Sequence, residues 1–179
     1  MELRVASPTT FDSIVDGPGL RMVIWTQGCI HNCAGCHNPQ THSLNGGYKL
    51  EVNEVIDIIR NLKLQKGITL SGGEPFLQSE VLELIAKEAR RNKLDVWAYT
   101  GFTFEELLEQ EDKDYNDRIK LLNQIDVLVD GKFELSKRDI SLKFRGSYNQ
   151  RIIDVQRSLK ENDIILKYEY MDEVLSIAK

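Results

Sequence analysis

The chain has 179 residues, 41% of them hydrophobic and 28% charged, which is the composition of an ordinary globular domain. Its formal net charge of −5, with no basic stripe, excludes a general nucleic-acid-binding surface. No apolar run approaches the roughly 20 residues of a membrane span, so no membrane partner is expected. The N-terminus lacks the pattern of a signal peptide, and the clustered, odd-numbered cysteines make a poor disulfide framework. We therefore expect a cytoplasmic protein with reduced thiols.

Segments typical of strands alternate with segments typical of helices. The sequence predicts strands where β-branched and aromatic residues gather: ELRVA near the start, then 22–28, 68–75, 94–101, 125–131 and 163–170. It predicts helices where apolar residues recur at helical spacing: 51–62, 79–92 with Ser79 as N-cap, and a segment opening at 104–110. The alternation indicates βαβ units in a single domain spanning residues 1–179.

Five to six mostly parallel strands are too few for a full barrel of eight. We therefore expect an α/β fold in the form of a partial, open β/α barrel. Its unusual residues all follow predicted strands: Cys29, Gly72-Gly73-Glu74, Thr100-Gly101 and Asp130. Parallel sheets carry their sites at this edge, so we expect these residues to share one rim.

The three cysteines of the chain, Cys29, Cys33 and Cys36, lie in the stretch CIHNCAGCHN with the spacing C-x3-C-x2-C. One interpretation is a buried helical stripe, which the intervening Asn32 and Gly35 disfavour. A second is a zinc site completed by a histidine: His31, His37 or His42. A third is an iron–sulfur cluster, which thiolates suit.

The missing fourth cysteine favours a reactive cluster. A cubane cluster normally takes four protein thiolates, so three leave one iron without a protein ligand. An open coordination position is typical of catalytic metal sites, whereas an electron carrier closes its site. We therefore expect an exchangeable ligand on that iron.

The cysteine spacing followed by GGEP resembles the radical S-adenosylmethionine (SAM) superfamily. Further segments resemble the family of glycyl-radical enzyme activases that act on anaerobic ribonucleoside-triphosphate reductases. These segments run in order over most of the chain: VDGPGLR (15–21), CHNPQT (36–41), ITLSGGEPF (68–76), WAYTGF (97–102), DVLVDGKF (126–133) and FRGSYNQRIIDV (144–155).

The resemblance implies a radical-SAM-type partial barrel, one [4Fe-4S] cluster and SAM as cosubstrate. In this family an external one-electron donor, such as reduced flavodoxin, reduces the cluster. SAM is then cleaved to methionine and a 5′-deoxyadenosyl radical, which takes a hydrogen atom from a glycine of the reductase. The implied partners are therefore the reductase and an electron-donor protein.

The resemblance also implies roles for particular residues. Cys29, Cys33 and Cys36 would ligate the cluster and form the catalytic set. Contacts with SAM would come from residues of three segments: Gly35, Cys36, His37, Gly72, Gly73, Glu74, Asp130 and Lys132. Gly35 stands where the superfamily usually has an aromatic residue on the adenine. Two interpretations of His37 stay open: it supplies this ring instead, or it is a solvent-exposed loop histidine.

Other assignments stay open at this point. Alternation along the strand predicts Trp97 and Tyr99 on one face, where both can be core residues. Arg145, Asn149, Gln150 and Arg151 suit either a grip on the partner's glycine loop or a structural turn. Rival functions are an activase of the pyruvate formate-lyase type, a non-catalytic zinc or iron–sulfur module, and a thiol oxidoreductase using Cys33 and Cys36.

Overall fold

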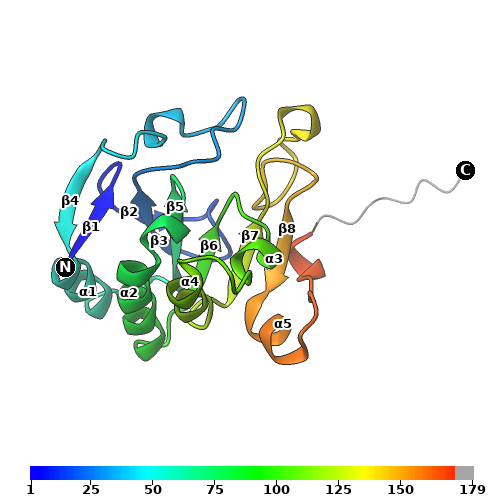
Figure 1. Cartoon of the computed structure of the whole chain (residues 1–179). Helices are drawn as coiled ribbons and strands as arrows, with labels where there is room; N and C mark the ends of the chain where they lie inside the picture. Colours follow the sequence, from blue (N-terminus) through cyan, green and yellow to red (C-terminus); the bar gives the residue numbers. More distant parts are fainter. Residues whose placement is uncertain (172–179) are drawn as a thin grey trace, which may run out of the picture.

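Residues 1–171, which the computed structural model describes, contain a mixed sheet with its helices along one face (Figure 1). The sheet has the strand order β4-β1-β3-β5-β6-β7-β8, and β2 pairs with β3 beside this path. The strands are β1 (Glu2–Val5), β2 (Thr10–Ser13), β3 (Arg21–Thr26), β4 (Tyr48–Glu51), β5 (Gly67–Gly72), β6 (Asp95–Tyr99), β7 (Val127–Asp130) and β8 (Arg151–Asp154).

The helices are short and amphipathic. They are α1 (Val52–Arg60), α2 (Ser79–Arg91), α3 (Phe104–Leu107), α4 (Tyr115–Leu122) and α5 (Val155–Glu161). Four 3₁₀ turns occur at η1 (Pro39–Thr41), η2 (Pro75–Gln78), η3 (Leu135–Lys137) and η4 (Tyr168–Tyr170). Within residues 1–171, no helix has the length and apolar character needed to cross a bilayer.

The expected partial radical-SAM barrel of five to six mostly parallel strands is wrong. The sheet has eight strands, and four of its seven pairings are antiparallel. Parallel pairing is confined to β3, β5, β6 and β7. The two ends of the sheet account for the difference, because β1, β2 and β4 at one end and β8 at the other pair antiparallel with their neighbours. Strand β8 follows β7 through the loop of residues 131–150, without the crossover helix of a βαβ unit.

Strands β2, β4 and β8 escaped the sequence prediction. Like β1 and β7 they have four residues each, but β2 and β4 contain no buried residue and so lack an apolar pattern, and β8 contains only two buried residues. The strand expected over 163–170 is wrong: Leu166 forms an isolated bridge with Ile153, and the η4 turn follows. Ser79 is the first residue of α2, whereas Gln78 occupies the N-cap position.

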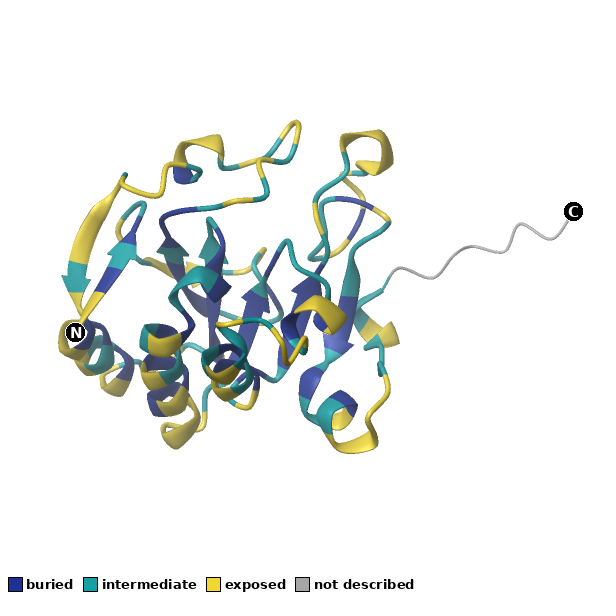
Figure 2. Ribbon diagram, in the orientation of Figure 1, coloured by how far each residue is buried: buried dark blue, intermediate teal, exposed yellow. Residues whose placement is uncertain are grey.

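The two faces of the sheet bury different groups. The helical face buries aliphatic side chains of the strands, such as Ile24, Leu70 and Ala98, against the helices. Figure 2 shows the helices buried toward the sheet and exposed on their outer sides. The opposite face carries Trp97 and the partly buried Tyr99 in one cluster, which confirms that they share a face.

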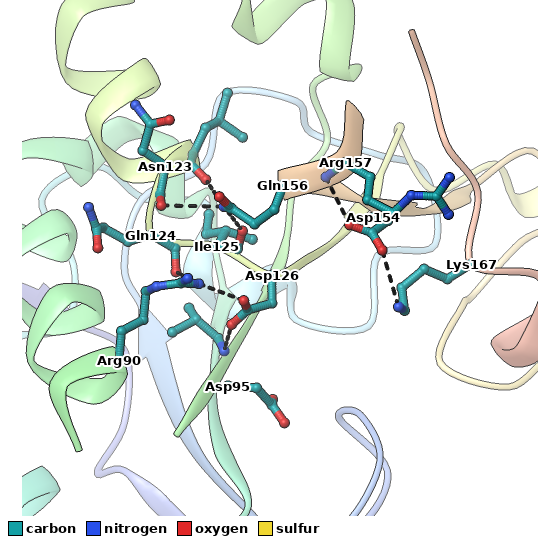
Figure 3. A network of polar contacts seen from close by, with 12 residues as sticks. Arg90, Asp95, Asn123, Gln124, Ile125, Asp126, Asp154, Gln156, Arg157 and Lys167 are labelled. Atoms are coloured by element: carbon teal, nitrogen blue, oxygen red, sulfur yellow. Dashed lines mark hydrogen bonds and ion pairs between the residues drawn. The ribbon is translucent and has the colours of Figure 1, made fainter. Parts of the chain in front are cut away.

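Polar contacts connect strands and helices at the edge where the parallel strands begin, here called the N-terminal edge (Figure 3). Asp126 accepts hydrogen bonds from the Val96 N–H (2.8 Å) and from Arg90 Nη1 (2.5 Å). Gln156 Nε2 donates to the Ile125 carbonyl at 2.6 Å. Arg21, fully buried, forms an ion pair of 2.5 Å with Asp95. This edge is therefore held together by its own side chains.

Candidate functional site

A cavity of about 450 Å³ lies at the C-terminal edge of the parallel strands. Two loops bound it: residues 29–42, here called the cysteine loop, and the 131–150 loop, both at the top of Figure 1. The segment before β3 and the ends of β5 and β6 complete the wall. Its lining includes Val15, Asp16, Cys29, His31, Cys33, Cys36, His37, Ser71, Gly72, Gly73, Tyr99, Thr100, Gly101, Gly131, Phe133, Arg145 and Gln150. The expected convergence of motifs on one rim is thus confirmed for most of them.

The cysteine loop leaves β3 without forming a helix around its thiols, which excludes the buried helical stripe. Gly28, Asn32 and Gly35 have φ of 99°, 48° and 74°, a left-handed region that turns the chain and favours glycine. The three cysteines are free and half-buried, and all of them line the cavity. Local folding therefore brings the three thiols to one wall.

The thiols match the donor set of an iron–sulfur cluster. In such a cluster each thiolate binds a different iron, so the ligands surround a cage instead of converging on one ion. Within residues 1–171, no group of three His, Cys, Asp or Glu side chains is placed to hold a metal ion. The fit to the cluster therefore rests on the chemistry of the donors: three thiols on one cavity wall and no fourth cysteine in the sequence.

Burial acts on the first of these thiols. It raises the pKa of the Cys29 thiol; the backbone of His31 partly offsets this rise, and the nearby Glu74 carboxylate adds to it. Without a metal, Cys29 is thus held as a neutral thiol. Metal binding requires the thiolate, so loading the site releases this proton.

The three histidines considered as zinc ligands lie in different surroundings. His31 Nε2 lies 2.8 Å from Glu74 Oε2. The exposed His37 ring packs on Phe133, with ring centroids 5.2 Å apart. His42 Nε2 is buried and, in the described part of the chain, has no hydrogen-bond partner. His31 and His37 line the cavity, whereas His42 does not.

Glu74 is fully buried behind the cavity wall and does not line it. Its Oε1 accepts from the Phe76 N–H (3.0 Å) and from the Thr100 hydroxyl (2.9 Å). Its Oε2 accepts from the Gly101 N–H (2.8 Å) and contacts His31. The carboxylate therefore connects the cysteine loop with the segments that follow β5 and β6.

Gly72 and Gly73 line the cavity where the chain leaves β5 close to the end of β3. A Cβ on Gly73 would lie 2.3 Å from the Gly28 carbonyl oxygen, and one on Gly72 would lie 2.6 Å from the Thr26 nitrogen. Such distances exclude any side chain at either position. The glycines thus let β5 and the start of the cysteine loop pack backbone against backbone.

Gly35 lies outside the cavity lining and packs against the 131–150 loop. A Cβ on Gly35 would approach Leu135 Cδ1 to 2.9 Å. With the contact between His37 and Phe133, this makes two points at which the cysteine loop touches the 131–150 loop.

Asp130 and Lys132 flank Gly131, which lines the cavity, but neither lines it itself. Asp130 is buried, pairs with Arg151 and accepts a hydrogen bond from the Phe104 N–H (2.8 Å). Lys132 is exposed. Neither side chain therefore shares the cavity wall with the cysteines.

Sequence reasoning did not include Asp16, Ser71 and Tyr99 in the site, yet they line the cavity. Burial raises the pKa of Tyr99, and the negative charge of Asp16 adds to this effect, so the phenol stays protonated at neutral pH. The signal for Asp16 was present in the segment VDGPGLR. Tyr99 carries no comparable signal, because alternation alone does not separate a core residue from a cavity residue.

Arg145 and Gln150, left open by the sequence, line the cavity and also hold the 131–150 loop together. Gln150 Oε1 accepts from the Gly146 N–H (2.8 Å), and its Nε2 donates to the Gly131 carbonyl (3.0 Å). Arg145 Nη1 donates to the Gln150 carbonyl at 3.0 Å. Asn149 Nδ2 closes the base of the same loop through the Lys132 carbonyl at 2.8 Å.

Comparison with known proteins agrees with this donor set. Residues 15–153 match the sequence family described as a 4Fe-4S single cluster domain. The chain is similar to anaerobic ribonucleoside-triphosphate reductase-activating proteins of Vibrio cholerae (38% identity, covering 78% of this chain and 90% of the relative) and Escherichia coli K12 (34%, 76% and 90%). The protein of that name from Enterobacteria phage T4 is 34% identical over 77% of this chain and 86% of its own length.

Proposed function

This chain belongs to the family of anaerobic ribonucleoside-triphosphate reductase-activating proteins, and from that membership we propose that it activates such a reductase by generating a glycyl radical on it. The chain is thus an activating enzyme of the oxidoreductase type. The sequence left open a second function, activation of pyruvate formate-lyase. The relatives reported above do not support it, because all of them carry the reductase-activating name.

Cys29, Cys33 and Cys36 would hold the [4Fe-4S] cluster. The chemistry that a bound cluster supplies is one-electron reduction of SAM, which gives methionine and a 5′-deoxyadenosyl radical able to take a hydrogen atom from a glycine. Three thiolates would leave one iron of the cluster without a protein ligand, and SAM is the ligand we propose for it. The observation that carries this proposal is the set of three cavity-lining thiols without a fourth cysteine.

The remaining wall suits a methionyl group and an adenosyl group together. Gly72 and Gly73 line the cavity, where their backbone would meet the methionyl end, and the exposed His37 ring offers a surface for the adenine. Cys36 lines the same cavity, whereas Gly35, which lies outside the lining, would act only by letting the cysteine loop pack against Leu135. Glu74 and Asp130, buried and fully engaged, would act from behind the wall, and Lys132 would reach the carboxylate of SAM from the rim.

The reaction also requires an electron from outside the chain. We propose a reduced flavodoxin-type protein as donor and the cytoplasm as location, where the three free thiols stay reduced. The chain as one domain, residues 1–179, would meet donor and reductase in turn.

The test is anaerobic reconstitution with iron and sulfide, reduction with dithionite, and addition of SAM and the reductase. The expected result is 5′-deoxyadenosine together with the electron paramagnetic resonance signal of a glycyl radical on the reductase. The Cys33→Ala variant should give neither product. Tight binding of one zinc ion, without cleavage of SAM, would overturn the proposal in favour of the zinc module.

A disulfide between Cys33 and Cys36 that turns over with thiol substrates would instead support the thiol oxidoreductase. Deoxyadenosine formation without a radical on the reductase would point to a different glycyl-radical partner. Each outcome thus selects one of the rival functions.

A further inference from the structure

His31 lies between Cys29 and Cys33 on the cysteine loop, and its side chain is turned into the protein. The side chain is 5% exposed, and its Nε2 lies 2.8 Å from Oε2 of the fully buried Glu74. A polar contact to a buried carboxylate is stronger than one between neutral groups, because the low local dielectric favours it. The imidazole is thus fixed to a group that cannot move without breaking three other hydrogen bonds.

The segment that follows β6 holds the ring sterically. A Cβ on Gly101 would lie 2.3 Å from the His31 ring, so only glycine fits beside it. Phe102 meets the ring edge-on, with centroids 4.6 Å apart and an interplanar angle of 78°. The Arg118 guanidinium covers Phe102 in turn, 4.7 Å from its centroid. The imidazole therefore lies in a socket formed by Glu74, Gly101 and Phe102, which are far from it in sequence.

The cysteine loop has few other attachments at this point. In the part of the chain that the structure describes, the backbone of residues 30–35 makes no hydrogen bond to the backbone of another segment. The nearest such bond runs from the Glu74 N–H to the Gly28 carbonyl at 2.7 Å, whereas the bonds of Gly28 to Thr41 and of Cys29 to His42 join the two ends of the loop itself. His31 is thus the main polar anchor of the loop between the first two cysteines.

We propose that His31 is a positioning residue, not a metal ligand: its contact with Glu74 fixes the cysteine loop so that three thiolates, and only three, reach the cluster. This inference rests on the proposed function for the identity of the cluster, whereas the anchoring itself concerns the protein alone. Outer-shell residues that orient ligands typically alter metal affinity about 10- to 100-fold.

The test uses two substitutions at His31 and one at its partner. His31→Gln keeps an N–H donor for Glu74, His31→Leu removes it, and Glu74→Gln removes the negative charge. Glu88→Gln is a matched control. Like Glu74, Glu88 is a buried carboxylate with a basic partner, in this case Arg60 at 2.8 Å, but it lies on α2 and does not line the cavity.

Two measurements, one on the metal-free protein and one on the reconstituted protein, test the anchoring by His31 separately from the proposed function. In the metal-free protein, the rates at which a small alkylating reagent labels Cys29 and Cys33 should rise about tenfold in His31→Leu and Glu74→Gln, and less in His31→Gln. In the reconstituted protein, loss of iron to a chelator should accelerate about 10- to 100-fold in the same order. Glu88→Gln should match the wild type in both.

Unchanged labelling in His31→Leu would overturn the proposal, even if the wild-type protein binds no cluster at all. A second contrary result is iron loss that is complete in His31→Gln but unaffected in Glu74→Gln, since that pattern identifies His31 as a ligand. The spectrum of the reduced cluster supplies a further check: it should keep its wild-type features in His31→Gln.

Discussion

The two edges of the parallel strands use polar side chains in opposite ways. At the N-terminal edge, polar groups bind one another: the buried Arg21 pairs with Asp95, and Asp126 binds Arg90 and the Val96 N–H. Figure 3 shows the contacts of Asp126. At the C-terminal edge, three free thiols and Tyr99 line an open cavity. Polar groups that face each other hold the fold, whereas those that face a cavity are available to a ligand.

The C-terminal edge also has buried polar side chains that stabilise the fold and do not line the cavity. Glu74 and Asp130 are as buried as Arg21 and have similarly complete sets of partners. Substitutions at the two edges should therefore divide into those that abolish chemistry and those that reduce stability.

The largest effect is expected at the thiols. Cys36→Ser should abolish cluster binding and SAM cleavage, because serine is a poor ligand for iron in such clusters. The unfolding free energy of the metal-free protein should change by less than about 1 kcal/mol, since the Cys36 side chain is half-buried and not part of a disulfide. Iron analysis, deoxyadenosine assays and urea titration measure the three quantities. A variant that keeps wild-type iron content would refute the assignment.

Arg21→Ala tests the N-terminal edge. Removing one partner of a wholly buried ion pair typically costs about 3–5 kcal/mol, but the Asp95 side chain is 28% exposed, so the charge left behind is partly solvated. Arg21 also donates hydrogen bonds to the Thr69 hydroxyl at 2.7 Å and the Ile68 carbonyl at 2.6 Å, so a loss of about 3 kcal/mol, at the lower end of this range, is expected. Urea unfolding of the metal-free protein measures the loss, and the folded fraction should still bind iron. A loss below about 1 kcal/mol would show that this edge is not essential to the fold.

Asp126→Ala should have a smaller effect on the same edge. It leaves the Val96 N–H without its acceptor and removes the contact with the partly exposed Arg90, at a cost of about 1–3 kcal/mol. Asp117→Ala is the control, since Asp117 forms only an exposed ion pair with Lys120. That variant should stay within about 0.5 kcal/mol of the wild type in thermal unfolding. Equal losses in the two variants would contradict the expected difference.

The smallest effect is a pH dependence at the cavity. The folded-state pKa of Tyr99 is raised above 10.0 by burial, so the phenol stays protonated in the folded chain when the unfolded chain ionises. Its contribution to stability is therefore present below pH 10 and falls as pH rises above it, by less than about 1.4 kcal/mol per pH unit. Tyr99→Phe should lose less stability than the wild type between pH 9 and 11. Parallel pH profiles would contradict the burial of this phenol.

The sequence predicted the elements with strong local patterns. The strand before Cys29, the helix after residue 51 and the strand that ends at Gly72 are each long enough for their apolar pattern to show. The antiparallel ends of the sheet escaped prediction, because β4 and β8 are four-residue strands paired with partners far along the chain. No local pattern records such pairing, so the partial barrel was a reasonable but wrong extension of the central strands.

The sequence predicted the part of the site that depends on residue spacing, namely the three cysteines. It was not predictable where a role depends on distant contacts. Nothing near Glu74 in the sequence indicates that its carboxylate meets His31, 43 positions earlier, or Thr100, 26 positions later. In the same way, Asp130 follows a strand as expected, but its pairing with Arg151 appears only when β8 is placed beside β7.

The cavity wall described above draws on residues from Val15 to Gln150, a span that covers most of the chain. During synthesis on the ribosome, the cysteine loop therefore emerges long before its neighbours on β6 and the 131–150 loop exist. Until then the thiols lie on an unfinished chain without the socket for His31. A product truncated before residue 131 would therefore carry every cysteine and still lack the 131–150 side of the pocket around them.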